Sequence, residues 1–209
     1  MEYSVPMALA DFIPIALFAA AGIILMRDLY NKMSKGAFAL FAAGLIDVTF
    51  AGAFKALYKL LYAAGACDFT ALSAMFFPVQ SVGFLLAGIG IVAMLAHKQG
   101  RTAVYAAPPV FAGTFIFVAM MVAGAGMICA SMCVVVKKLR KPALSALFIL
   151  SFLCLLGMGY LSSRDFAQAS MNWIAEGVNI LAEGSLLLGA VLAHRNGLAE
   201  LRLRDGEAA

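Results

Sequence analysis

The sequence predicts an all-α integral membrane protein, a bundle of six or seven transmembrane helices with seven favoured. Of 209 residues, 64% are hydrophobic and only 12% are charged, about half the charged share of a typical soluble domain. The mean hydropathy is +0.97. The apolar runs are long and do not alternate with polar residues, which excludes the short alternating strands of a membrane β-barrel. Residues 1–209 are therefore expected to form one transmembrane domain.

Apolar runs of about 20 residues, the length that crosses a bilayer as a helix, recur along the chain. Spans are expected over about 7–26, 36–57, 71–96, 142–161 and 166–193, with one or two more inside 103–136. Pro14 and Pro78 should interrupt the first and third spans, because proline lacks a backbone donor and crowds the preceding turn. No Lys or Arg precedes the first run, so we expect a retained span and not a cleaved signal peptide.

The stretch from Ala103 to Val136 decides the number of spans. As one helix it would be roughly 50 Å long, against a hydrocarbon layer of about 30 Å. If it crosses once, the basic residues divide evenly between the two sides. If it crosses twice as a tight hairpin, 12 basic residues of the loops and the tail share one side, and Arg164 is the one basic loop residue on the other, as the positive-inside rule favours.

The second arrangement gives seven spans, an N-terminus outside and a cytoplasmic C-terminus. The expected location is a cell membrane, with a bacterial inner membrane favoured. The alternative is a six-span protein that inserts in both orientations, for which an even charge distribution is natural.

A shift of 97 residues aligns two parts of the chain without a gap, with 8 of 33 positions identical. The most specific match pairs the run that ends in His97–Gly100 with the run that ends in His194–Gly197. This pattern predicts an internal repeat of residues 32–100 and 138–197, with 101–137 as a linker helix between parallel halves. The outline is similar to sugar transporters and sorting receptors with paired triple-helix bundles, although their hallmark Pro-Gln dipeptide is absent and Pro78-Val79-Gln80 does not match it.

Four polar residues of the last span are spaced 4, 3 and 4 apart, which places them on one helix face. They are Asn172, Glu176, Asn179 and Glu183. An ionised side chain at bilayer depth costs roughly 2.5–3.5 kcal/mol on insertion scales. Two glutamates in one span therefore favour a site for a cation, an amine or a proton. The alternative is that they pair with Lys55 and Lys59 and only join helices.

Two further polar residues are expected at similar depth: Asp47 near the middle of the second span, and Gln80 just after Pro78. With Asn172, Glu176, Asn179 and Glu183 they form the predicted substrate-binding set near the midplane, where transporter sites lie. The sequence shows no catalytic triad and no phosphate-binding loop. No catalytic residue, metal site or cofactor is predicted.

These features favour a small multi-pass transporter for a small polar or cationic solute, with proton coupling as an option. The alternative is a non-transporting ligand sensor or a subunit of a larger complex. A third hypothesis, less favoured, is an intramembrane enzyme that acts on a lipid with a pair of carboxylates. The expected partners are the lipid bilayer, a small-molecule or cation ligand and, as an option, a second copy of the chain. Basic residues in short clusters between apolar runs argue against a nucleic-acid partner.

Overall fold

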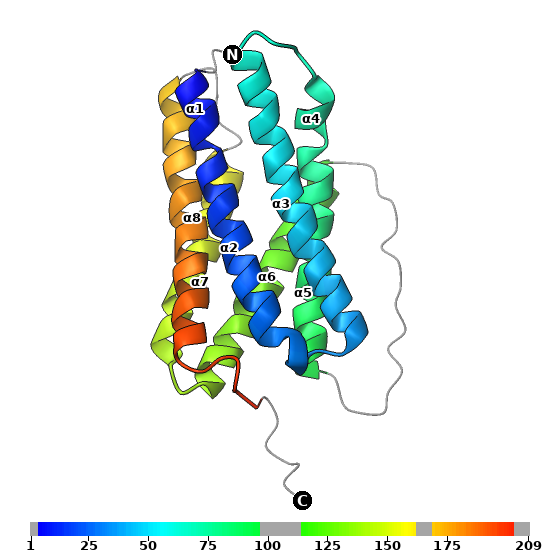
Figure 1. Cartoon of the computed structure of the whole chain (residues 1–209), viewed down its shortest axis with the longest axis vertical. Coiled ribbons are helices and arrows are strands. Elements are labelled where there is room, and N and C mark those ends of the chain that lie inside the picture. The colour runs from blue at the N-terminus through cyan, green and yellow to red at the C-terminus, as the bar shows by residue number, and fades with distance from the viewer. Residues whose placement is uncertain (1–3, 97–113, 162–168, 203–209) are drawn as a thin grey trace, which may run out of the picture.

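The structure, a computed structural model, describes residues 4–96, 114–161 and 169–202, all of them in helices and short connections (Figure 1). The helices are α1 (Val5–Ala10), α2 (Phe12–Leu29), α3 (Lys35–Ala63), α4 (Thr70–Ala74), α5 (Phe76–Ala96), α6 (Thr114–Lys138), α7 (Ser145–Leu161) and α8 (Ala169–Arg195), with short 3-10 turns at Tyr30–Lys32 and Pro142–Leu144.

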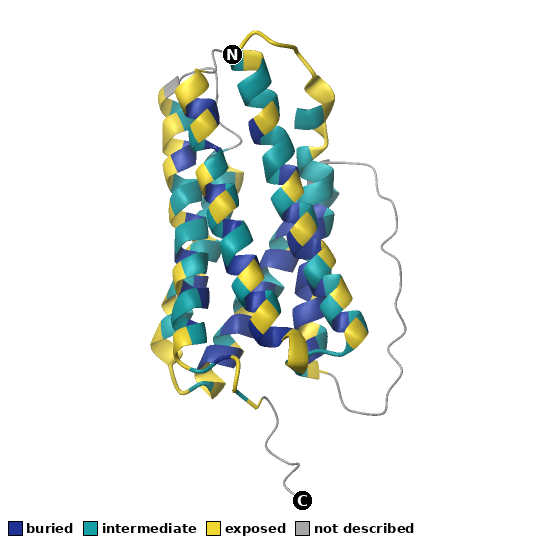
Figure 2. Cartoon of the chain, in the orientation of Figure 1, coloured by how far each residue is buried: buried dark blue, intermediate teal, exposed yellow. Residues whose placement is uncertain are grey.

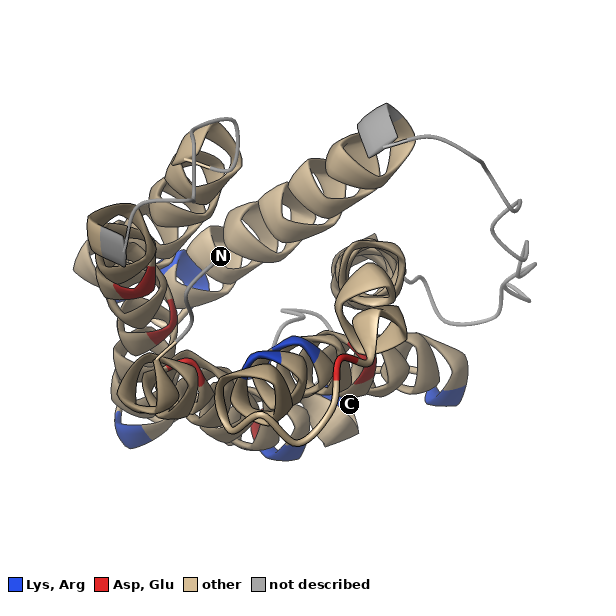
Figure 3. Cartoon of the chain, turned by 90° about the horizontal axis from the view of Figure 1, so that it is seen from above, with Lys and Arg blue, Asp and Glu red and all other residues tan. Residues whose placement is uncertain are grey.

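Six of these segments, counting α1 with α2 and α4 with α5, are long and apolar enough to cross a membrane. Most of each helix carries no charged residue (Figure 3). The all-helical, multi-pass membrane class is therefore confirmed, and the lipid bilayer is a partner of the protein.

Both predicted proline interruptions are present. α1 ends at Ala10, four residues before Pro14, and α4 ends at Ala74, four residues before Pro78. In each case the chain makes one turn residue, Asp11 or Met75, before it resumes as a helix. The cause is that proline cannot donate to the carbonyl four residues earlier and its ring crowds that carbonyl.

The long helices place their basic ends together. α2, α5, α6 and α8 end, and α3 and α7 begin, at the end of the molecule where the C-terminus lies (Figure 1). We call this the basic end, because it holds Arg27, Lys32, Lys35, Lys137, Lys138, Arg140, Lys141 and Arg195. The predicted gathering of basic residues on one side is therefore present in the described part of the chain.

α5 and α6 follow one another in sequence and yet run in the same direction (Figure 1). Thr114–Lys138 is one continuous helix, which would form the second arm of the expected hairpin between Ala103 and Val136. Any further crossing would fall within residues 97–113, outside the described residues. Gly124 lies inside α6, where it permits a close approach to α5 and does not form a turn.

The helices alternate in direction within each half of the molecule. α2, α3 and α5 run towards, away from and towards the basic end, and α6, α7 and α8 repeat this order (Figure 1). Parallel halves would have this arrangement, but it does not test a duplication. The repeat of residues 32–100 and 138–197 stays a prediction, as does the linker assigned to 101–137, of which α6 occupies the second part.

Glycines bring α3, α5 and α6 into close contact. A Cβ built on Gly44 of α3 would lie 2.3 Å from the Gly83 carbonyl oxygen of α5, and one on Gly124 of α6 would lie 2.2 Å from the Phe84 carbonyl carbon. Only glycine allows backbones to approach so closely. α8 packs mainly against α2 and α7. The bundle thus consists of an α3–α5–α6 group and an α2–α7–α8 group.

The two groups close against each other at the basic end. Fully buried apolar side chains from α2, α5 and α6 and from the turn after α8 fill this region (Figure 2): Leu25, Leu29, Ile91, Met132, Val135, Val136 and Leu198. Asp28 is 3% exposed there, and it accepts a hydrogen bond of 2.8 Å from Nδ1 of His194. Lys32 donates to the Ala199 carbonyl at 2.6 Å, which joins α2 to the chain beyond α8.

Candidate functional site

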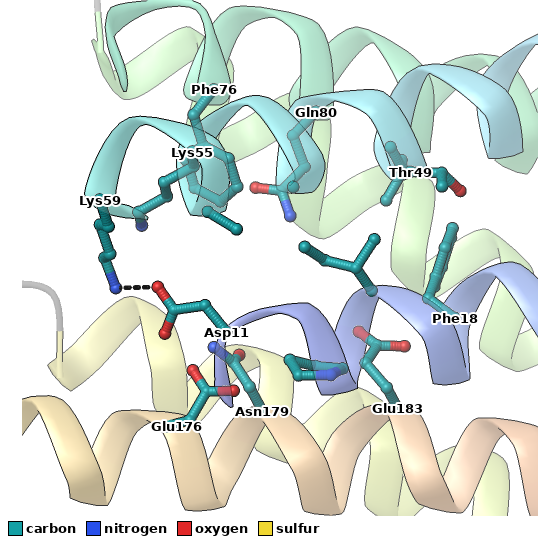
Figure 4. Close-up of a pocket in the computed structure, with 15 residues that line it drawn as sticks. Asp11, Phe18, Thr49, Lys55, Lys59, Phe76, Gln80, Glu176, Asn179 and Glu183 are labelled. Atoms are coloured by element: carbon teal, nitrogen blue, oxygen red, sulfur yellow. Dashed lines mark ion pairs between the residues drawn. The ribbon is translucent and has the colours of Figure 1, made fainter. Parts of the chain in front are cut away.

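A polar pocket of about 110 Å³ lies between the two helix groups, in the half of the bundle away from the basic end (Figure 4). That volume holds several water molecules or a small organic solute. Its lining comes from the break between α1 and α2 and from α2, α3, α5 and α8: Asp11, Pro14, Ile15, Phe18, Val48, Thr49, Gly52, Lys55, Ala56, Lys59, Phe76, Gln80, Glu176, Asn179 and Glu183.

A charged cluster occupies the end of the pocket nearest the start of the chain. The helix break before Pro14 places Asp11 there, and its Oδ2 lies 2.5 Å from Nζ of Lys59. Asp11 also lies within hydrogen-bonding reach of the Glu176 carboxyl group. An ionised carboxylate has no donor, so a hydrogen bond between two carboxyl groups needs a proton on one of them. Asp11 and Glu176 can thus share a proton beside the Lys59 ammonium.

Lys55 lies one helical turn before Lys59 on the same face of α3. Its ammonium nitrogen is 4.0 Å from the centre of the Phe76 ring, a cation–π contact. Lys55 forms no ion pair within 4.0 Å among the residues that the structure describes. A carboxylate partner for this ammonium is therefore missing from the described pocket wall.

Glu183 lies deeper, with Asn179 one turn before it on α8 and Gln80 opposite on α5 (Figure 4). Their side chains have no hydrogen-bond partner within the described residues. Glu183 Oε2 and Glu176 Oε1 are both buried without a partner in that part of the chain. Since buried polar atoms are nearly always hydrogen-bonded, this set points to water or a ligand in the pocket.

A second, smaller and mostly apolar pocket of about 40 Å³ begins where the first one ends. Phe18 and Glu183 line both pockets, and Phe18 is only 4% exposed. The further lining comes from α5, α6, α7 and α8: Phe84, Ala125, Ile128, Cys129, Phe148, Ser151, Phe152, Leu155 and Leu186. Phe18 and Glu183 therefore stand between a polar space and an apolar one nearer the basic end.

The structure brings four of the six predicted site residues together: Glu176, Asn179, Glu183 and Gln80 line one pocket. Asp47 and Asn172 do not line it. Asp47 is turned towards the α3–α5 contact, where its Cβ lies beside Gly83. Val48, the next residue, lines the pocket, and one step along a helix rotates the side-chain direction by about 100°. Asn172 lies one turn before Glu176, towards the start of α8.

Sequence reasoning missed Asp11 and treated Lys55 and Lys59 only as partners for the glutamates. The signal for Asp11 is its position three residues before Pro14, where a break in the helix is expected. The signal for the lysines is their spacing of four, which continues the Thr49 and Gly52 face of α3 into the pocket. Lys59 pairs with Asp11, an acid from the first span that the sequence reasoning had not considered.

Comparisons with protein-family models, with curated proteins and with solved structures found no match to this chain. The pocket and the two helix groups around it are therefore the basis for inferring a function.

Proposed function

We propose that this protein is a small membrane carrier for a small polar or cationic solute, which binds in the pocket between the two helix groups. The observation that carries the proposal is Glu183, a glutamate in the interior of a transmembrane bundle whose carboxyl group has no partner among the described residues. An ionisable residue in this position is costly, so a purely structural helix would not retain it without a partner.

The arrangement of the helices supports transport. The pocket lies between groups that each pack more closely within themselves than with one another, and carriers bind solute between bundles that move as units. The basic end is closed by fully buried side chains. In this state the solute reaches Glu183 from the opposite end, and a relative movement of the two groups would open the path past Phe18.

The Asp11–Glu176 pair supports coupling to protons. The two carboxyl groups lie close enough to share one proton, with Lys59 beside Asp11. The other charged groups on the pocket wall are Lys55 and Glu183. Release of the shared proton would leave an additional negative charge beside the solute site, so proton movement and solute binding are linked there.

We also propose an orientation in which the basic end faces the cytoplasm and α1 starts outside, which the positive-inside rule supports. The proposed location is a bacterial inner membrane. Cys67 is exposed in the connection before α4, at the opposite end. An impermeant maleimide should therefore label Cys67 in intact cells. In a Cys67→Ser background, Lys35→Cys and Lys141→Cys should be labelled only after permeabilisation. Labelling of Lys35→Cys in intact cells would contradict this orientation.

The transport test is uptake of radiolabelled amines and amino acids into proteoliposomes, with and without a pH gradient. Uptake by the wild-type protein that Glu183→Gln abolishes would support a carrier, provided that Glu200→Gln, a change at the exposed basic end, keeps it. Binding that depends on Glu183 without any uptake would favour the alternative function, a ligand sensor. A sensor needs access from one side of the membrane alone, which the closed basic end allows. The absence of both binding and uptake would overturn the proposal.

A further inference from the structure

The charged groups of the pocket divide into a partnered and an unpartnered set. At one end, Asp11 pairs with Lys59 and lies beside the Glu176 carboxyl group. Lys55 and Glu183 have no oppositely charged partner within 4.0 Å among the described residues, and they stand on opposite walls, on α3 and α8 (Figure 4). The pocket thus offers one basic and one acidic side chain, each without an ion-pair partner in the described part of the chain, to whatever enters it.

We propose that the solute is amphoteric: a short amino acid whose carboxylate binds Lys55 and whose ammonium group binds Glu183. This inference rests on the proposed function, since it names the solute class for the same pocket. Each pole gains a charge-assisted hydrogen bond, the stronger kind in a site shielded from water.

A solute with one charge fits the pocket less well. A simple amine would pair with Glu183 but would leave the Lys55 ammonium group without a counter-charge. A simple acid would pair with Lys55 but would leave the Glu183 carboxyl group without a partner. Leaving one buried charge unpaired is strongly unfavourable, which is how a site rejects the wrong ligand. An amino acid pairs both groups at once.

The unpartnered amides fit the same ligand class. Gln80 and Asn179 line the pocket together with Lys55 and Glu183, and each amide carries both a donor and an acceptor. They can accept from an ammonium group and donate to a carboxylate. The Phe76 ring beneath Lys55 holds the ammonium in position without neutralising it, so Lys55 keeps its charge available for a ligand.

The test is binding of three matched probes to the full purified chain by isothermal calorimetry and ligand-induced thermal shift. The probes are 4-aminobutanoate, butylamine and butanoate, extended by glycine, β-alanine and 5-aminopentanoate to vary the distance between the charges. At least one amino acid should bind about tenfold or more tightly than both butylamine and butanoate. Butylamine that binds as tightly as every amino acid would overturn the inference and leave a carrier for cations intact.

Variants assign the two poles. Lys55→Gln should weaken amino-acid binding about tenfold and leave butylamine binding unchanged or stronger. Glu183→Gln should also weaken amino-acid binding about tenfold, but it should leave butanoate binding unchanged or stronger. Lys35→Gln and Glu200→Gln, both exposed at the basic end, are the matched controls. If Lys55→Gln does not fold, Lys55→Arg keeps the charge and should shift the preferred amino acid in chain length. An unchanged probe preference in either Lys55 variant would overturn the inference.

Uptake separates this inference from the proposed function. Amino-acid binding with the expected dependence on Lys55 and Glu183 but without uptake would support the amphoteric site and overturn the carrier. Uptake of an amine with no amino-acid binding would support the carrier and overturn the amphoteric site.

Discussion

The packing of α5 against its neighbours α3 and α6 differs sharply from the arrangement of α8 and α3, which face each other across the pocket. In the first, glycines let the backbones touch, and a Cβ on Gly88 would lie 2.7 Å from the Gly124 carbonyl oxygen. In the second, the helices stand apart around a pocket that holds polar groups without partners. One interface is built for close packing, and the other leaves polar groups available for a ligand.

The difference indicates where the bundle is stable and where it can respond to a solute. In a bilayer, packing and satisfied hydrogen bonds stabilise helix contacts, because lipid is as apolar as the side chains. The α3–α5–α6 contacts meet that condition, and the pocket does not. Four substitutions test how packed, partnered and unpartnered groups differ, each with a matched control.

The largest effect is expected for Gly124→Ala. The new Cβ would lie 2.2 Å from the Phe84 carbonyl group, so α5 and α6 would have to separate, at a cost of about 3 kcal/mol in the free energy of unfolding. Melting temperature in detergent is the measurement. Gly157→Ala of α7 is the control, since its Cβ would meet nothing within 4 Å. Equal melting temperatures for the two variants would mean that the close glycine contact is not stabilising.

Asp28→Asn should have the next largest effect. The Asp28 carboxylate is buried and accepts from His194 at 2.8 Å and from Arg27 at 3.4 Å, so the change should lower the free energy of unfolding by about 1–2 kcal/mol. The comparison is Asp68→Asn, because Asp68 is exposed and accepts only a long bond of 3.3 Å from Tyr58. A Tm loss for Asp68→Asn as large as for Asp28→Asn would contradict the paired role of Asp28.

Glu183→Gln should change stability in the opposite direction. Removing a carboxyl group that has no partner among the described residues should leave the melting temperature unchanged or raise the free energy of unfolding by up to about 1 kcal/mol. Asp47→Asn, on the other face of α3, serves as the control for charge removal within a span. A clear loss of stability in Glu183→Gln alone would assign Glu183 to helix joining and not to ligand binding.

Thr49→Val should have the smallest effect. Thr49 lines the pocket, but its hydroxyl group donates to the Leu45 carbonyl of the same helix at 2.8 Å. Valine should therefore change the free energy of unfolding by less than about 0.5 kcal/mol and leave probe affinity unchanged, whereas Gln80→Leu should weaken binding. Equal losses of affinity in isothermal calorimetry would remove the distinction between partnered and unpartnered pocket groups.

The sequence predicts the helical membrane class well, because long apolar runs have few other structures available to them. It also predicts which α8 residues share a face, since a spacing of 4 and 3 determines this locally. Asp47 was predicted by its depth, and depth does not determine the direction a side chain takes around the helix. Asn172 was predicted by its helix face, and a shared face does not determine how far along α8 the pocket extends. Predicting Asp11 as a site residue requires the position of the helix break before Pro14. It also requires the packing of α1, α3 and α8 against one another, which is a tertiary property. The continuity of Thr114–Lys138 is likewise decided by its packing on α5.

The origin of the pocket residues has a consequence for how the protein is made. Asp11 comes from the first span and Lys55 and Lys59 from the second, but Glu176 and Glu183 come from the last one. During synthesis the two lysines reach the bilayer long before the glutamates opposite them, and an ionised side chain in lipid is costly. Asp11 is the early counter-charge, and it pairs with Lys59. Lys55 has no such early counter-charge, and the pocket around it is complete only when α8 has been inserted. A chain that stalls before α8 would therefore leave the Lys55 ammonium group open to lipid, where membrane proteases and chaperones could recognise it.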